Sequence, residues 1–214
     1  MRMNFDPGLY LVTDRDLALG RPLKEVIRKA VTGGVTMVQL REKNASTREF
    51  IQEALSIKVL LKQHHIPLII NDRVDVALAV DADGVHIGQQ DMSWRMARRL
   101  LGPEKILGLS VESMDHLQEA NHADIDYIGI SPVFITPTKK ELEQGLGLTG
   151  TAEIARMSRH PSVAIGGIHA KNASEVLETG VDGISVVSAI CSAEDPEIAA
   201  KNLAEIVEKS KNLL

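Results

Sequence analysis

Short apolar runs alternate along this chain with longer segments whose apolar residues recur every three or four positions. The short runs are rich in Val, Ile and Leu, which is typical of strands buried on both faces of a parallel sheet. Eight of these runs are predicted to be strands, and they span residues 8–13, 35–40, 67–70, 84–87, 106–109, 127–130, 162–168 and 183–190.

The segments between these runs have helical spacing. The first of them places Leu23, Val26 and Ile27 on one face and ends at a pair of glycines. Ser46 and Glu49 match a capping box, a pattern that begins many helices. Helices are predicted over residues 23–32, 50–63, 74–80, 93–101, 114–121, 171–180 and 197–214, with a short additional helix beginning at Ser188.

This alternation of strands and helices indicates a parallel sheet, and eight strands are enough to close such a sheet into a barrel. The expected fold is therefore an α/β, (β/α)8 TIM barrel. A length of 214 residues suits one such domain, since these barrels commonly take about 250 residues. No linker or low-complexity tract divides the chain, so residues 1–214 are expected to form a single domain.

Composition narrows the range of partners. Aromatic residues make up 3% of the chain and the formal net charge is -5, so neither stacking platforms nor a basic face for nucleic acid is expected. The single cysteine, Cys191, excludes an internal disulfide. No apolar run approaches the ~20 residues that cross a bilayer, and no segment resembles a signal peptide. We expect a cytoplasmic protein that binds neither nucleic acid nor membrane.

Polar side chains collect where the predicted strands end. In a parallel barrel these positions surround one mouth, and TIM-barrel active sites lie there. The polar residues at this end are Gln39, Arg41, Lys43, Asn71, Asp72, Asp91, Ser110, Thr136, Thr138, Lys139 and Ser188. A long connection, residues 131–148, is interpreted as an active-site lid. His86 alternates with apolar residues on a strand and is expected to be a hydrogen-bonded core histidine.

Asp72 and Asp91 follow adjacent strands, so their carboxylates can meet. Paired carboxylates that face cations suit Mg²⁺, which keeps several waters and takes its other ligands from carboxylates and substrate phosphate. The alternative is that each aspartate caps a helix, and Asp91 is well placed to do so ahead of Ser93. Because the two carboxylates occur together among cations and hydroxyls, we favour the metal interpretation.

Two separate anion sites are indicated. Gly167 after the seventh strand and Ser188 after the eighth stand where barrels often bind phosphate, although such glycines can also serve only as turns. Arg41, Lys43 and Lys139 bring positive charge to the same mouth, unless they are solvated rim charges. No nucleophile–base pair stands out, which favours stabilisation of a leaving group over covalent catalysis.

The motifs at these strand ends resemble those of thiamine phosphate synthase. They are Leu9-Tyr-Leu-Val-Thr-Asp14, Val38-Gln-Leu-Arg-Glu-Lys43, Ile70-Asn-Asp72, Gly84-Val-His-Ile-Gly-Gln89 with Asp91, Gly108-Leu-Ser110, Thr136-Pro-Thr-Lys139, Ala164-Ile-Gly-Gly-Ile168 and Val187-Ser-Ala189. The resemblance implies a Mg²⁺-dependent transferase that joins hydroxymethylpyrimidine diphosphate to hydroxyethylthiazole phosphate and releases pyrophosphate. The implied mechanism is dissociative: diphosphate leaves first, and the thiazole nitrogen captures the pyrimidinylmethyl cation.

Carried over residue by residue, the resemblance assigns three sets of ligands. The pyrimidine diphosphate would be held by Gln39, Leu40, Arg41, Glu42, Lys43, Asn71, Ser110 and Lys139. The Mg²⁺ ion would be held by Asp72 and Asp91, and the thiazole phosphate by Thr136, Pro137, Thr138, Gly167, Val187 and Ser188. The catalytic groups would be Arg41, Lys43, Ser110 and Lys139. Ile135 departs from the family pattern, which has proline at that position.

Two other functions fit part of this pattern. A related thiazole tautomerase shares the barrel but lacks much of the diphosphate-binding set, whereas both aspartates, Ser110 and Lys139 are present here. A non-catalytic protein that senses thiamine phosphate would not need the second anion site. We therefore favour the synthase, acting on small-molecule substrates either alone or as a homo-oligomer.

Overall fold

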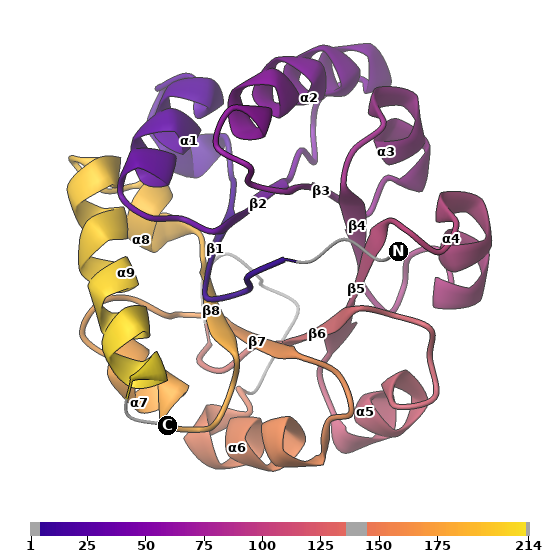
Figure 1. Ribbon diagram of the computed structural model, residues 1–214, viewed down its shortest axis with the longest axis vertical. Helices are drawn as coiled ribbons and strands as arrows, with labels where there is room; N and C mark the ends of the chain where they lie inside the picture. Colours follow the sequence, from indigo (N-terminus) through magenta and orange to yellow (C-terminus); the bar gives the residue numbers. More distant parts are fainter. Residues whose placement is uncertain (1–4, 136–144, 213–214) are drawn as a thin grey trace.

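The computed structural model describes residues 5–135 and 145–212. Its strands form a closed barrel in sequence order, and every neighbouring pair is parallel, including β8 with β1 (Figure 1). They are β1 (Leu9–Val12), β2 (Met37–Leu40), β3 (Leu68–Asn71), β4 (Gly84–Ile87), β5 (Ile106–Val111), β6 (Tyr127–Ile130), β7 (Ser162–Ile165) and β8 (Gly183–Val186). The (β/α)8 barrel expected from the sequence is confirmed.

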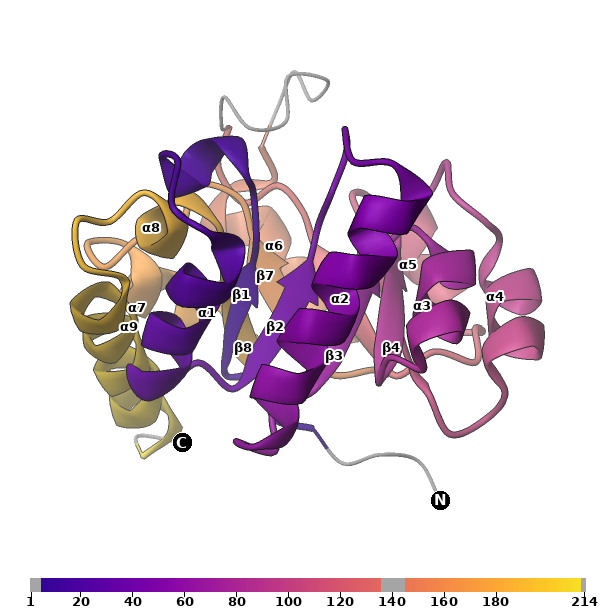
Figure 2. The ribbon, with the colours of Figure 1, turned by 90° about the horizontal axis from the view of Figure 1, so that it is seen from above.

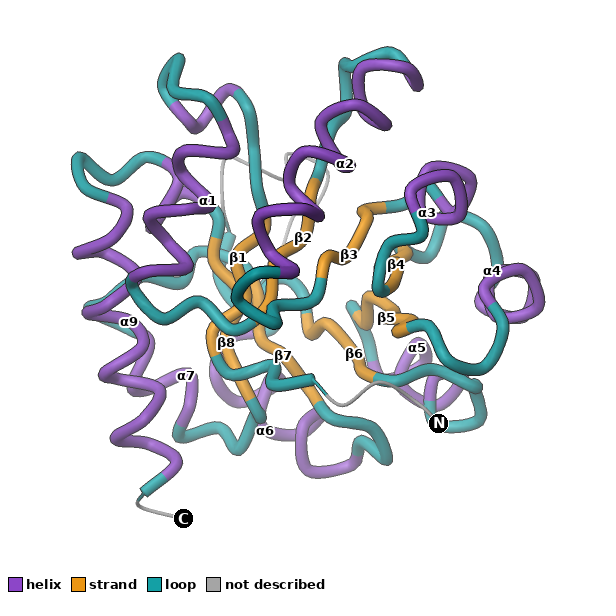
Figure 3. Tube along the Cα trace, turned by 45° about the horizontal axis from the view of Figure 1, so that its top comes forward, coloured by secondary structure: helices purple, strands orange, loops and turns teal. Residues whose placement is uncertain are grey.

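Helices surround the strands on the outside, as the tube in Figure 3 shows. They are η1 (Asp16–Ala18), α1 (Leu23–Thr32), α2 (Thr47–Lys62), α3 (Val74–Val80), α4 (Trp94–Leu101), α5 (Met114–Ala120), α6 (Gly147–Met157), α7 (Ala173–Leu177), α8 (Ser188–Cys191) and α9 (Pro196–Lys211). The predicted helices are all present, with ends that differ by a few residues. No helix in residues 5–135 or 145–212 is long and apolar enough to span a membrane.

Local sequence signals account for where the helices begin. The Ser46 hydroxyl accepts a hydrogen bond from the Glu49 amide, and the Glu49 carboxylate accepts one from the Ser46 amide, which is the predicted capping box. Asp195 caps α9, whose first residue is Pro196. Proline suits that position because the first helical amide has no partner within the helix.

The apolar residues form two cores. An aliphatic core lies between the outer face of the strands and the helices, and it includes Leu11, Leu40 and Ile70. A second core fills the barrel interior with Tyr10, Met37, Ile69, Ile106, Tyr127 and Val163, and Phe5 packs against it. The large Tyr127 ring fits because Gly108 on β5 has no side chain; a Cβ there would overlap the ring. The interior is therefore packed, and the site must lie at one end of the barrel.

The structure differs from the predicted elements around β6, β7 and β8. Helix α6 has no predicted counterpart and begins inside the connection expected over residues 131–148. The strands predicted over residues 162–168 and 183–190 end earlier, at Ile165 and Val186. Gly166 (φ 117°) and Gly167 (φ 65°) have positive φ angles, which end β7 in a turn.

Candidate active site

The segments that follow the strands lie on one side of the barrel, the upper side in Figure 2, where α8 also lies. We call this end the mouth. Of the residues predicted to bind substrate, Thr136, Pro137, Thr138 and Lys139 lie outside the described part of the chain. The other predicted residues belong to the ends of β2, β3, β5, β7 and β8 and the segments after them, and to the segment after β4.

The structure brings the carboxylates of Asp72 and Asp91 together. Asp72 follows β3 in the left-handed conformation (φ 61°), and its amide donates to the carbonyl of His86 on β4, 2.9 Å away. The Asp91 carboxylate accepts a 2.7 Å hydrogen bond from the Gly88 amide. The pKa of Asp91 is raised, mainly by burial, and the charge of Asp72 and a hydrogen bond between the two side chains raise it further.

Asp91 does not cap α4. Ser93 is the capping residue, and its hydroxyl accepts from the Met96 amide. The carboxylate of Asp91 remains beside that of Asp72, where the Lys43 ammonium also lies, 2.7 Å from Asp72 Oδ2. In this arrangement one lysine partly compensates two carboxylates that repel each other.

These carboxylates fit Mg²⁺ by their chemistry. No cluster of three or more His, Cys, Asp or Glu side chains capable of holding a metal occurs among the described residues. A donor set limited to two carboxylates is what Mg²⁺ commonly takes from a protein when phosphate oxygens and water complete its coordination. Zn²⁺, by contrast, is usually held by three or four nitrogen or sulfur ligands.

Arg41 is oriented at the mouth by the segment that follows β1. Its Nη1 lies 2.8 Å from Asp14 Oδ2, and its amide donates to the hydroxyl of Thr13 over 3.1 Å. Asp14 is itself fixed, since its other carboxylate oxygen accepts from the amides of Asp16 and Leu17. Among the described residues, Asp14 is the only side-chain partner of the guanidinium, so its remaining N–H groups can bind an anion.

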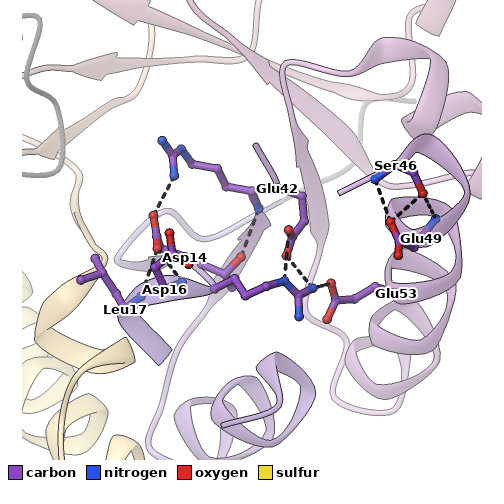
Figure 4. Close-up of polar contacts among 10 residues, drawn as sticks. Asp14, Asp16, Leu17, Glu42, Ser46, Glu49 and Glu53 are labelled. Atoms are coloured by element: carbon purple, nitrogen blue, oxygen red, sulfur yellow. Dashed lines mark hydrogen bonds and ion pairs between the residues drawn. The ribbon is translucent and has the colours of Figure 1, made fainter. Parts of the chain in front are cut away.

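The side chains of Leu40 and Glu42 are engaged in contacts within the protein. Leu40 is buried in the outer aliphatic core. The Glu42 carboxylate is 3% exposed and accepts from Arg15, whose guanidinium also binds Glu53 of α2. Figure 4 shows Glu42 and Glu53 in one polar group and Asp14 in another. Burial is the main cause of the raised pKa of Glu53, so this group resembles a structural ion pair.

Gln39 and Ser110 are buried just inside the mouth. The Gln39 Nε2 donates to the Tyr10 hydroxyl over 2.7 Å, and Ser110 Oγ lies 2.9 Å from His86 Nε2. His86 is hydrogen-bonded as expected, since its other ring nitrogen lies 2.9 Å from the hydroxyl of Tyr127, but it is only partly buried. Asn71 ends β3 and is partly exposed at the same end.

Gly167 and Ser188 follow neighbouring strands, as the sequence predicted. The turn at Gly167 is fixed by Asn172, whose side-chain Nδ2 donates to the Gly167 carbonyl over 3.0 Å. Val187 precedes α8, which begins at Ser188. Arg21 supports the C-terminal end of α8, where it donates to the carbonyls of Cys191 and Ala193 over 2.6 and 2.8 Å.

Sequence reasoning missed several groups that support these residues. Asp14 and Arg21 both lie between β1 and α1. Asp14 ends one of the motifs that resemble the family, but the sequence predicts no role for either side chain. Tyr10 and Tyr127 were assigned to strands with no polar role. Alternation along β1 and β6 could have placed both tyrosines inside the barrel, but their pairing depends on the register of the closed sheet.

A closed parallel barrel whose mouth gathers two carboxylates, an arginine and a lysine has the architecture of a TIM-barrel enzyme with a charged active site. Comparison with known families is specific: the model of a family described as thiamine monophosphate synthase matches residues 9–190. The chain belongs to this family, and it is a transferase, as its relatives are.

Several relatives match along nearly their whole length. The thiamine-phosphate synthase of Albidiferax ferrireducens is 52% identical over 94% of this chain and 91% of its own length. The thiamine-phosphate synthase of Vibrio campbellii is 55% identical over 91% and 95%. Among solved structures, the thiamine phosphate pyrophosphorylase of Pyrococcus furiosus matches with a TM-score of 0.89 and 42% identity, covering 96% of this chain and 97% of that one. A 3-hexulose-6-phosphate synthase, 17% identical with a TM-score of 0.69, shares the fold alone.

Proposed function

We propose that this chain transfers the hydroxymethylpyrimidine group from its diphosphate to hydroxyethylthiazole phosphate in a Mg²⁺-dependent reaction. The observation that carries the proposal is the convergence of Asp72, Asp91 and Lys43 at one mouth with Arg41. A diphosphate leaving group needs such a set of cations, whereas a protein that handles one monophosphate does not. The whole chain, residues 1–214, is proposed to act as one catalytic domain.

In the proposed reaction, the bond between the pyrimidinylmethyl carbon and the diphosphate oxygen breaks, and its electron pair leaves with the diphosphate. The thiazole nitrogen then gives its lone pair to the same carbon and forms the new C–N bond. Arg41 and Lys43 would bind the diphosphate oxygens, and Asn71, Ser110, Gln39 and Lys139 would hold the rest of that substrate. No enzyme nucleophile is needed for either step.

Asp72 and Asp91 would hold the Mg²⁺ ion. When bound, the ion supplies positive charge that stabilises the departing diphosphate. Lys43 contacts Asp72 in the described structure and would give its charge to the diphosphate once Mg²⁺ binds the carboxylates. Gly167, Val187 and Ser188, with the segment 136–138, are proposed to hold the thiazole phosphate beside it.

The test is the release of pyrophosphate by the purified chain. Release should require both substrates and Mg²⁺, and EDTA should abolish it. The variant Asp72→Asn should lose at least about 100-fold in rate, because a metal on a leaving group is worth several kcal/mol. Isomerisation of a thiazole carboxylate phosphate in EDTA, without pyrophosphate release, would instead identify a tautomerase. Tight binding of thiamine phosphate without turnover would identify a sensor.

A further inference from the structure

A continuous chain of hydrogen bonds crosses the interior of the barrel below the mouth. It runs from Gln39 Nε2 to Tyr10 Oη (2.7 Å), from Tyr10 Oη to Tyr127 Oη (2.9 Å), from Tyr127 Oη to His86 Nδ1 (2.9 Å) and from His86 Nε2 to Ser110 Oγ (2.9 Å). Its two ends, Gln39 and Ser110, belong to the side chains proposed to hold the pyrimidine diphosphate. Its middle members, Tyr10, Tyr127 and His86, are not themselves among the residues proposed to bind substrate or Mg²⁺.

Two glycines leave space for these hydrogen-bonded side chains in an otherwise apolar core. Gly108 leaves space for the Tyr127 ring, and a Cβ on Gly129 would lie 3.0 Å from His86 Cε1. Tyr10 and Tyr127 are 2% and 0% exposed. The Phe5 ring packs against Tyr127 with ring centres 5.7 Å apart. Two tyrosine hydroxyls at this depth need partners, since an unpaired buried hydroxyl is costly.

The direction of the hydrogen bonds follows from counting hydrogens. Burial raises the pKa of both Tyr10 and Tyr127, so each hydroxyl keeps its proton. The Tyr10 oxygen accepts from Gln39, and its only other partner among the described residues is the Tyr127 hydroxyl. Tyr10 therefore donates to Tyr127. The opposite direction would leave the Tyr10 hydrogen without an acceptor among the described residues.

The remaining steps follow in order. Tyr127 accepts from Tyr10, so its own hydrogen goes to His86 Nδ1, which must be unprotonated. The neutral imidazole then carries its hydrogen on Nε2 and donates it to Ser110 Oγ. The Ser110 hydroxyl thus accepts from His86 and keeps its own hydrogen for another acceptor.

We propose that Tyr10 and Tyr127 are positioning residues which, through His86, fix Ser110 as a hydrogen-bond donor toward the substrate. This inference rests on the proposed function for the identity of that substrate. The substrate atom that meets Ser110 is then an acceptor, either an unprotonated ring nitrogen of the pyrimidine or an oxygen of its diphosphate. An amino group could meet only the second lone pair of Ser110 Oγ and would leave the Ser110 hydrogen without an acceptor in the substrate.

The first test reads the histidine tautomer and needs no substrate. In full-length protein with ¹⁵N-labelled histidine, NMR should show His86 with hydrogen on Nε2 and none on Nδ1; His86→Gln identifies its signals. Tyr127→Phe removes the donor to Nδ1 and should give a mixture of both tautomers. Phe5→Leu, which alters packing on Tyr127 but no hydrogen bond, should retain the wild-type pattern. Hydrogen on Nδ1 of the wild-type His86 would overturn the proposal.

The second test is kinetic. Tyr127→Phe should raise the KM for the pyrimidine diphosphate about 5- to 10-fold, the cost of roughly one hydrogen bond, and leave the KM for the thiazole phosphate unchanged. Tyr10→Phe should act in the same direction. Because both act through Ser110, the Tyr127→Phe loss should disappear in a Ser110→Ala background. An equal loss in both backgrounds would contradict the positioning role.

Inhibition by fragments identifies the acceptor. Weaker inhibition of Tyr127→Phe by pyrophosphate assigns Ser110 to the leaving group, and weaker inhibition by hydroxymethylpyrimidine alone assigns it to the ring. Inhibition unchanged for both fragments would count against the proposal. If the wild-type protein transfers no pyrimidine group, the proposed function fails. The NMR result still decides the direction of the hydrogen bonds from Gln39 to Ser110.

Discussion

Asp14 Oδ2 lies 2.8 Å from Arg41 Nη1, and the next residue on each segment forms a second ion pair with the charges reversed. Arg15 binds Glu42 over 2.8 Å and also contacts Glu53 on α2. The Asp14–Arg41 pair orients an arginine at the mouth. The Arg15–Glu42 pair, through the contact of Arg15 with Glu53, links the same two segments to α2. Because β1 and β2 are hydrogen-bonded neighbours, the two pairs extend the link between the strands into the segments that follow.

Asp14→Asn should weaken binding of the pyrimidine diphosphate. The guanidinium of Arg41 would lose its charged partner and with it part of its fixed orientation, so KM should rise about 5- to 10-fold. Asparagine retains an acceptor for the amides of Asp16 and Leu17, so the fold should persist. Steady-state kinetics check this, with Asp16→Asn as the control. An unchanged KM in Asp14→Asn would show that Arg41 is oriented by something else.

Asp91→Asn should stabilise the metal-free protein at neutral pH. Burial and the charge of Asp72 raise the pKa of Asp91 above the ordinary 3.8, so ionised Asp91 costs folding stability. That cost appears as pH rises above 3.8 and is complete above the raised pKa. Asparagine removes it and can still accept from Gly88, so Tm should rise by roughly 1–2 °C at pH 7.

Two further measurements complete this prediction. The gain in Tm should vanish as the pH falls below the ordinary aspartate pKa, where wild-type Asp91 is also neutral. Saturating Mg²⁺ with pyrophosphate should reverse the order, because only the wild type would be stabilised by the ion. A lower Tm for metal-free Asp91→Asn at pH 7 would contradict the pKa direction.

The barrel itself was predictable, because eight buried strands and the helices between them leave two distinct periodicities in the sequence. Helix α6 was not predictable, since Gly147 and Gly150 weaken the helical pattern at its start. Its packing against β6 and α7 must supply the remaining stability of the helix. The outward side chain of Glu42 could have been inferred from strand alternation after β2. The resemblance instead assigns all of residues 39–43 to the pyrimidine diphosphate, without regard to the alternation of side chains.

The supporting contacts of the site were beyond the sequence for a different reason. Tyr10 and Tyr127 are 117 residues apart, and their hydroxyls meet only once the barrel closes with a particular register. The same holds for Arg21 and Cys191, which lie 170 residues apart. Their hydrogen bond joins the connection before α1 to α8. Strand-end positions could be read locally, whereas these contacts follow from tertiary geometry.

Arg21→Met should weaken binding of the thiazole phosphate and leave the pyrimidine diphosphate largely unaffected. The variant removes the hydrogen bonds that hold the carbonyl end of α8, so Ser188 at its other end loses support. We expect a KM increase of about 3- to 10-fold and a loss of roughly 1–3 kcal/mol in the free energy of unfolding. Kinetics with each substrate varied, and urea unfolding, measure the two effects.

The control for this variant is Arg28→Met, an exposed arginine on α1. It should change neither KM nor stability appreciably. Equal increases in both KM values for Arg21→Met would indicate a general loss of structure rather than a displaced α8.

Gly108→Ala should severely destabilise the protein. The added methyl group would overlap the Tyr127 ring inside the barrel, and a packed interior relieves such overlap poorly. We expect a loss of at least about 2–3 kcal/mol in unfolding free energy, measured by urea denaturation. Gly150→Ala is the matched control, because it lies in α6 with Leu146 Cβ 3.3 Å away, and helix propensity favours alanine there. A stable, fully active Gly108→Ala would contradict the packing described.

A crystal structure of the chain with thiamine phosphate, pyrophosphate and Mg²⁺ tests the central claim most directly. The account predicts density for Mg²⁺ bound to the carboxylates of Asp72 and Asp91 and to a pyrophosphate oxygen, with Arg41 and Lys43 on the same pyrophosphate. The phosphate of the product should lie at Gly167 and Ser188. Pyrophosphate bound elsewhere, or Mg²⁺ that contacts neither aspartate, would contradict it.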